Sequence, residues 1–195
     1  MKKFFRFLAV AVMACFFAAP AMGKAEAAKV VVLPLVNMET EENNASAVFM
    51  KEAVGFFKYP SYDLIGDDIL DPILAKENYK EVGKQGPNEA MLRRILKASG
   101  ADIILMVRLN ELEENSDNRG KEMLEKLVIK ADVMSVNAFT NKVYSDKINK
   151  TDEIEYALVV RDDWKHDQFA KVCRKTFKDI TKGSLLIFRI MEVFL

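Results

Sequence analysis

The strongest hydrophobic pattern in the chain is a run of five consecutive apolar residues, from Ile103 to Val107. It follows Gly100, a residue typical of helix ends, and leads into a mostly polar segment that finishes at Leu112. A continuous apolar run is typical of a strand covered on both faces, whereas alternation is typical of a strand with one face in water. Residues 103–112 therefore predict a strand that starts inside a sheet and ends at its rim.

The residues before this strand predict strand–helix crossover units. β-Branched runs favour strands, and apolar residues at helical spacing favour helices. Asp67 or Asp68 is suited to cap the second helix. In chain order, the predicted elements are a strand (29–36), a helix (45–58), a strand (62–66), a helix (67–74), a loop (82–87) and a helix (88–99).

The residues after the strand at 103–112 predict an antiparallel meander closed by a helix. Asn141 is the residue best suited to the left-handed position of the tight turn between the last two strands. In chain order, the predicted elements are a hairpin loop (113–121), a strand (126–139), a turn (140–142), a strand (143–150), a connection (152–163) and a helix (164–182).

This order of elements predicts a protein of the α/β class (α+β mixed) with a mixed sheet. Crossovers make parallel neighbours, and tight turns make antiparallel ones. We expect five strands in the order 2-1-3-4-5, with three to four helices packed on the sheet.

The N-terminus matches a secretory signal peptide. Lys2, Lys3 and Arg6 form its positive region, and an apolar stretch and several small residues follow. The stretch is shorter than the roughly 20 residues of a membrane-spanning helix, which disfavours a retained anchor. We therefore expect residues 1–23 to be cleaved and residues 24–195 to form one α/β domain.

Small residues further along the chain make cleavage after Ala27 the alternative. The residues around Cys15 faintly resemble a lipoprotein attachment site, but they remain apolar beyond the cysteine, so lipidation is disfavoured. The expected location is the periplasm or another exported compartment.

Charge and cysteine content narrow the class of protein. Loss of the signal lowers the 29 basic residues to 26 against 29 acidic ones, a net charge of about −3. That balance argues against a nucleic-acid partner, because proteins that bind nucleic acids carry a basic patch or a high pI. Cys173 is the only cysteine left, so no intramolecular disulfide forms and stability must come from the core.

His166 and Cys173 are the first candidates for chemistry. His166 with Asp162 and Asp163 could hold a metal, but few ligands converge, and an acidic first turn favoured by the helix dipole is the simpler interpretation. Cys173 could be a nucleophile, but it lies on the apolar stripe of its helix, which indicates a buried, inert thiol.

Two other groups of residues could form a functional site, but we favour a structural role for each. Asp67, Asp68 and Asp71 could bind calcium or pair for acid–base work, but they lack the EF-hand spacing and suit a helix start. Four aromatic residues could stack a ligand or form core and rim; they are Phe56, Phe57, Tyr59 and Tyr62. We predict no catalytic, cofactor-binding or metal site, and no cofactor.

The C-terminal segment 185–195 is the most unusual stretch, because nine of its eleven residues are apolar. It could pack against the sheet, form an interface with a second copy or a partner, or contact a membrane surface. We expect its removal to lower the melting temperature or change the oligomeric state. The candidate interface residues are Leu185, Leu186, Phe188, Ile190, Met191 and Phe194.

The chain resembles the small α/β domain of bacterial envelope proteins, the group of the TolB N-terminal domain, CsgG and LpoB. The resemblance rests on the Val-Val-Val-Leu-Pro-Leu strand at 30–35 and on residues 95–105, where a helix end and Ser99-Gly100-Ala101-Asp102 lead into the central strand. It covers most of the mature chain and has no catalytic signature. It implies a periplasmic, non-enzymatic role in contact with other proteins.

The leading hypothesis is an exported, non-catalytic cell-envelope domain that binds protein or cell-wall partners. The alternative is a small periplasmic ligand-binding protein or hydrolase, which requires a cleft with convergent ionisable residues. A third hypothesis is a subunit that associates with itself.

Overall fold

A mixed β-sheet organises the residues that the computed structural model describes, which are 27–38, 43–118, 123–156 and 164–182. The α/β class is confirmed. In chain order, the elements are β1 (Ala28–Val32), β2 (Val36–Asn37), α2 (Asn43–Phe56), β3 (Tyr62–Leu64), α3 (Asp67–Lys76), α4 (Tyr79–Lys84), α5 (Glu89–Ser99), β4 (Ile103–Asn118), β5 (Met123–Asn137), β6 (Lys142–Tyr156) and α6 (Trp164–Thr181).

The strands follow the order β3-β1-β4-β5-β6, and β2 pairs with β4 beside this path. β1 runs parallel to both β3 and β4, whereas β4, β5 and β6 form antiparallel pairs. This confirms the predicted order 2-1-3-4-5, because β3 and β6 are the second and fifth strands of the prediction. β2 was not predicted as a separate strand.

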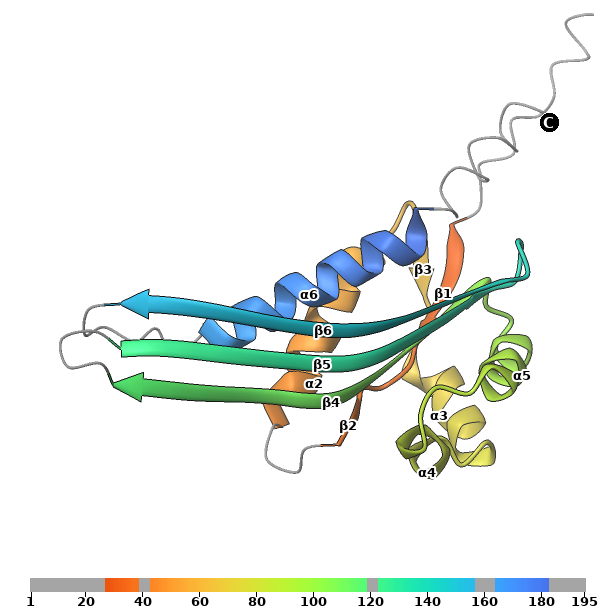
Figure 1. Cartoon of the computed structure of the whole chain (residues 1–195). Helices are drawn as coiled ribbons and strands as arrows, with labels where there is room; N and C mark the ends of the chain where they lie inside the picture. The colour runs from red at the N-terminus through yellow and green to blue at the C-terminus, as the bar shows by residue number, and fades with distance from the viewer. Residues whose placement is uncertain (1–26, 39–42, 119–122, 157–163, 183–195) are drawn as a thin grey trace, which may run out of the picture. The chain divides into compact units, whose positions relative to one another are not determined.

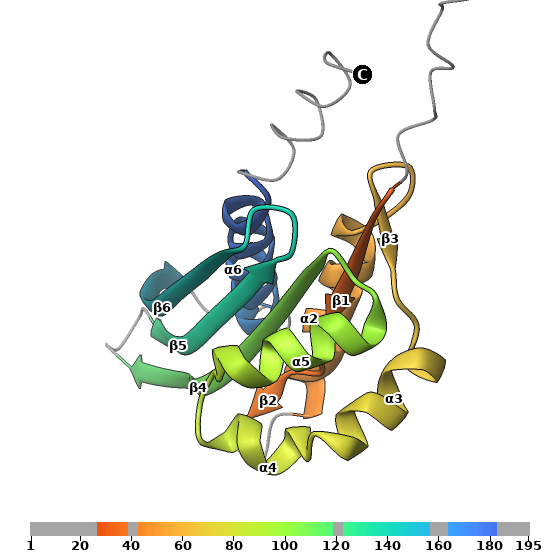
Figure 2. The same ribbon diagram turned by 90° about the vertical axis from the view of Figure 1, so that its right-hand side faces the viewer.

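The helices cover the two faces of the sheet unequally. α2 and α6 lie on one face along β4, β5 and β6, whereas α3, α4 and α5 lie on the opposite face near β1 (Figure 1, Figure 2). Phe49 of α2 and Phe177 of α6 meet with their ring centroids 5.8 Å apart. On the other face, Ile104 and Met106 of β4 are fully buried in the core with α3 and α5. The central strand is thus covered on both faces at its start, as its apolar run predicts.

Pro34 separates β1 from β2, and Tyr79 holds the chain at this break. The Tyr79 side chain is 3% exposed, and its hydroxyl donates a hydrogen bond of 2.7 Å to the Pro34 carbonyl oxygen. Tyr79 begins α4, a short helix that overlaps the predicted loop at 82–87, so that the described residues contain five helices where three to four were expected. The α4 helix therefore packs at the point where β1 ends and β2 begins.

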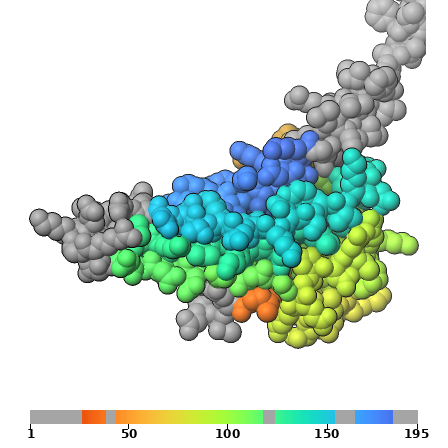
Figure 3. All heavy atoms as spheres, viewed as in Figure 1, coloured from red at the N-terminus to blue at the C-terminus, as the bar shows by residue number. Residues whose placement is uncertain are grey.

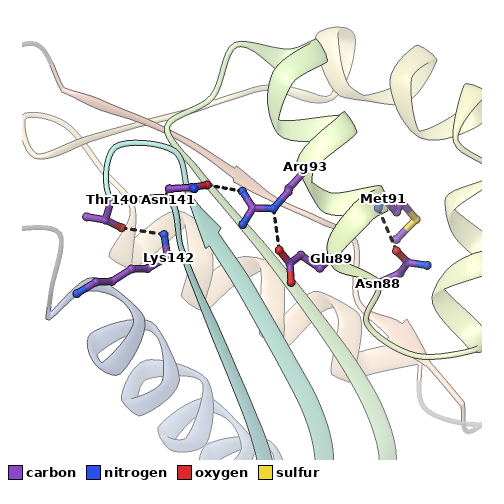
Figure 4. Close-up of polar contacts among 7 residues, drawn as sticks. All are labelled: Asn88, Glu89, Met91, Arg93, Thr140, Asn141 and Lys142. Carbon is purple, nitrogen blue, oxygen red and sulfur yellow. Dashed lines mark hydrogen bonds and ion pairs between the residues drawn. The ribbon is translucent and has the colours of Figure 1, made fainter.

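Hydrogen bonds also hold the β5–β6 turn against α5. Arg93 of α5 donates from Nη1 to Asn141 Oδ1 over 2.7 Å and from Nε to Glu89 Oε1 over 2.8 Å (Figure 4). Asn141 has the predicted left-handed backbone, with a φ of 52°. Asn88 caps α5 by accepting a hydrogen bond from the Met91 amide.

Two predictions about helix ends have different outcomes: the one for Gly100 is confirmed, and the one for Asp67 or Asp68 is wrong. Gly100 ends α5 with a φ of 67°, as expected for a residue that stops a helix in the left-handed region. Neither Asp67 nor Asp68 caps α3, because the N-cap is Gly66 and both aspartates lie in the first helical turn. Their charges still suit the positive end of the helix dipole there.

The predicted hairpin loop at 113–121 and the end of the last strand at 150 are wrong. β4 continues to Asn118, β5 starts at Met123, and β6 runs to Tyr156. The sequence signal failed because one face of this part of the sheet is open to solvent, so its strands carry polar residues. Backbone pairing with β5 supplies the hydrogen bonds that a loop would lack.

No described helix combines the length and hydropathy that crossing a membrane requires. The signal peptide and the C-terminal segment 185–195 lie outside the described residues, so the predictions made for them stay predictions.

Candidate interaction surface

The outer halves of β4, β5 and β6 expose one face of the sheet. Directly opposed residues of antiparallel strands point to the same side, so the pairing register identifies which side chains share this face. The atoms of the three strands lie at the surface when viewed from the side opposite α2 (Figure 3). We define the open sheet face by Glu111, Glu113, Lys126, Val128, Lys130, Lys147, Asn149, Thr151 and Glu153.

A β-bulge in β4 gives this face its polar character. The register shifts between Leu109 and Glu111, so that Asn110 is the extra residue. Leu109 and Leu112 then both point into the core, where they are 0% and 1% exposed, although they lie three residues apart. Glu111 is directed to the open face as a result.

Ion pairs cross the open sheet face between neighbouring strands. Lys130 of β5 lies 2.6 Å from Glu111 of β4, and Lys126 of β5 lies 3.4 Å from Glu153 of β6. Three of these four side chains are well exposed, and exposed pairs stabilise a fold by only about 0–1 kcal/mol. The face thus presents both signs of charge on rigid strands without a large role in folding.

A second polar cluster joins this face to the C-terminal end of α4. The Arg108 guanidinium donates from Nη2 to Asp132 Oδ2 over 2.8 Å and from Nη1 to the Lys84 carbonyl over 2.9 Å. The Asn110 amide donates to the same Asp132 oxygen over 2.9 Å. Gly86, at a φ of 117°, lets the chain pass close to Arg108.

Electrostatics hold Asp132 in its charged form. Burial alone would raise its pKa, but hydrogen bonds from Asn110 and Arg108 and the positive charges of Arg108 and Lys147 lower the pKa below its usual value. Arg108, Asp132 and Lys147 are the ionisable groups that converge here, and Arg108 is hydrogen-bonded to Asp132. This arrangement suits a structural clamp better than an acid–base pair, which needs a group available to exchange a proton.

Cys173 lies on the buried side of α6 and is 5% exposed. Burial raises the pKa of its thiol to about 12, with a further contribution from the Glu52 carboxylate. The thiolate is the reactive form, so both the position and the pKa favour the predicted inert thiol.

The histidine and aspartate candidates are not gathered into a site. His166 and Asp167 lie in the first turn of α6, and Asp162 and Asp163 fall outside the described residues. Among the residues that the structure describes, no group of three histidine, cysteine, aspartate or glutamate side chains is placed to hold a metal ion. Asp71 lies on α3 with the two aspartates of its first turn.

The four aromatic residues divide between core and surface. Phe57 and Tyr62 are 2% and 5% exposed, and Phe57 meets the Phe177 ring at 5.3 Å. Phe56 is partly buried and its ring centroid lies 5.7 Å from that of Phe177, whereas Tyr59 is 79% exposed. This is the core-and-rim arrangement rather than a stacking platform.

The sequence indicated only part of the open sheet face. From Leu127 to Val133, apolar residues alternate with Val128, Lys130 and Asp132, a pattern that could have indicated the exposed face of β5. The β4 side was missed, because Glu113 fell in the segment predicted as a loop. The candidate interface at 185–195 lies outside the described residues.

The chain is similar to solved structures of bacterial proteins at low sequence identity. No family model matches the chain, and no curated protein matches it. Among solved structures, lipoprotein GNA1162 from Neisseria meningitidis is 10% identical, with 80% of this chain and 99% of that one covered and a TM-score of 0.44. The PelC dodecamer from Paraburkholderia phytofirmans is 12% identical, with coverages of 77% and 85% and a TM-score of 0.41.

The LpoB C-terminal domain from Salmonella enterica is 10% identical, with coverages of 64% and 83% and a TM-score of 0.36. The chain is therefore similar to bacterial lipoproteins and to LpoB at low identity. All three TM-scores lie below 0.5, so none of these likenesses assigns a role. The closer resemblance to TolB and CsgG stays a prediction.

Proposed function

We propose that the chain is an exported, non-catalytic domain of the cell envelope that binds a protein or cell-wall partner through its open sheet face. The signal-like N-terminus supports the location. The open sheet face supports the mode of action, and it is the observation on which the proposal depends.

The chemistry of the face suits recognition of a polar partner. Lys126 and Lys130 alternate with the aliphatic Val128 along β5, and Glu111 and Glu153 flank them on the neighbouring strands. A partner that brings its own charges can exchange these weak surface ion pairs for new ones at little cost. Because the side chains stand on strands, little backbone ordering is needed on binding.

The experiment compares two charge-matched variants of the exported protein. Lys126→Glu with Lys130→Glu reverses the charge of the open sheet face, whereas Lys76→Glu with Lys97→Glu makes the same change in net charge on exposed positions of α3 and α5. Binding is measured by co-sedimentation with purified peptidoglycan and by chemical crosslinking in envelope extracts. Circular dichroism verifies that both variants fold.

We expect the open-face variant to lose at least tenfold in binding to whichever partner the wild type takes. The control variant should bind as the wild type does. Equal binding by the wild type and the open-face variant would rule out this surface as the docking site.

A further inference from the structure

We propose that β6 pairs antiparallel with β6 of a second copy, centred on Ile148, so that one sheet continues across two chains. The inference concerns the edge of the sheet and does not depend on what the open sheet face binds.

The edge formed by β6 is long and regular. β6 pairs with β5 over fifteen residues, from Lys142 to Tyr156, without a shift in register. Among the described strands it lies at the end of the sheet (Figure 1), whereas the opposite edge, β3, has three residues. Natural edges are usually shortened, bulged or interrupted by proline to prevent pairing with another chain. The β6 edge has none of these three protections. Its remaining protection is its charged side chains, among them Lys147 and Lys150, so the arrangement of these charges decides whether two copies can pair.

The charges of β6 select among the ways in which two copies could pair. In an antiparallel pair related by a twofold axis, the residue at the centre faces itself, and like charges that face each other are destabilising. Centres at Asp146, Lys147, Lys150 or Asp152 would each place a charged residue against itself. A centre at Asn149 would place Asp146 against the second copy's Asp152 twice.

A centre at Ile148 places no like charges directly opposite each other. Asp146 then faces the second copy's Lys150 on the side of α6, and this favourable pair occurs twice. On the other side, Ser145 faces the second copy's Thr151. The ladder spans thirteen residues, from 142 to 154, whereas a centre at Thr151 also avoids like charges but leaves only eleven described strand residues in register.

The present contacts of these residues are compatible with the pairing. Asp146 accepts hydrogen bonds from the Tyr144 hydroxyl, over 3.2 Å, and from the Lys147 amide. Lys150 is ion-paired with Asp152 of its own strand, and its side chain is 39% exposed. Lys150 would therefore lie between its own Asp152 and the second copy's Asp146.

The first test is a charge exchange in the exported protein, with mass measured by light scattering after size exclusion. Wild type should be a dimer at micromolar concentration. Asp146→Lys and Lys150→Asp should each weaken the dimer at least tenfold, because each places like charges in opposition. The double variant should restore the dimer. A monomeric wild type, or a double variant no better than the single ones, would overturn the proposal.

The second test fixes the register and does not depend on the charge variants. In the Ile148→Cys variant, the new cysteine faces the same cysteine of the second copy at a Cα separation of about 4.5–5.5 Å, which suits a disulfide. Oxidation should therefore link two copies. Ser145→Cys is the matched control and should not link alone, whereas Ser145→Cys with Thr151→Cys should.

The oxidised wild type gives the background from Cys173, the one cysteine expected in the exported protein. Equal crosslinking by the Ile148→Cys and Ser145→Cys variants, or self-linking by Thr151→Cys alone, would show that the stated register is wrong.

Discussion

The hydrogen bond from Tyr79 to Pro34 offers a direct test of how the first strand is held. The change is Tyr79→Phe, which removes one oxygen and keeps the ring. The hydroxyl lies 2.7 Å from the Pro34 carbonyl oxygen, and burial raises the pKa of Tyr79, so the group stays a neutral donor at all ordinary pH values. The carbonyl loses this partner when the hydroxyl is removed.

The expected loss of unfolding free energy is about 1 kcal/mol, the net contribution of a neutral hydrogen bond in a folded protein. For a domain of this size, that loss lowers the melting temperature by about 2–4 °C. Urea denaturation and differential scanning calorimetry both measure it. Tyr59→Phe is the matched control, because Tyr59 is 79% exposed and its hydroxyl should contribute almost nothing.

Equal stability of Tyr79→Phe and the wild type would refute the reasoning, as would an equal loss in the Tyr59 control. The first outcome would mean that packing alone holds the break at Pro34, and the second would mean that the loss does not come from the buried hydrogen bond.

Three further predictions follow from local contacts. Gly83→Ala should destabilise the protein by about 1–3 kcal/mol in urea denaturation, because its new Cβ would lie 2.8 Å from Val36 Cγ2; adding Val36→Ala should recover part of the loss. Asp132→Asn should remove a stability contribution that the charged carboxylate makes above its unfolded pKa of about 3.9 and that is lost as the pH falls through the lower folded pKa. The unfolding free energies of wild type and variant should therefore converge as the pH is lowered, and a constant difference between them would contradict this. Cys173 should react with a thiol reagent far more slowly in native than in unfolded protein, and equal rates would show that it is not buried.

Much of the fold could be predicted because the sequence patterns agree with the sheet where both of its faces are covered. The run from Ile103 to Val107 identified the central strand. Gly100 and Asn141 indicated a helix end and a turn, because both residue types tolerate the positive φ that these positions require. Strand order then followed from connection lengths, since short turns make antiparallel neighbours.

The candidate surface could not be predicted in full, because its physical signals are weak. Glu113 to Asp117 are exposed within β4, and a polar run of this kind has the composition of a loop. The bulge at Asn110 also breaks the alternation that would have extended the strand. Only the register with β5 reveals that Glu111 and Lys130 share one face.

The most direct measurement of the central claim is photo-crosslinking at Val128 of the open sheet face, inside cells. A photoreactive amino acid replaces Val128, which stands between Glu113 and Thr151 on the neighbouring strands. The matched control is the same replacement at Val54 of α2, a valine that is 56% exposed. The account predicts a discrete crosslinked envelope protein, or recovery with the cell wall, at Val128 and neither at Val54. Adducts at Val54 alone, or equal adducts at both positions, would contradict it.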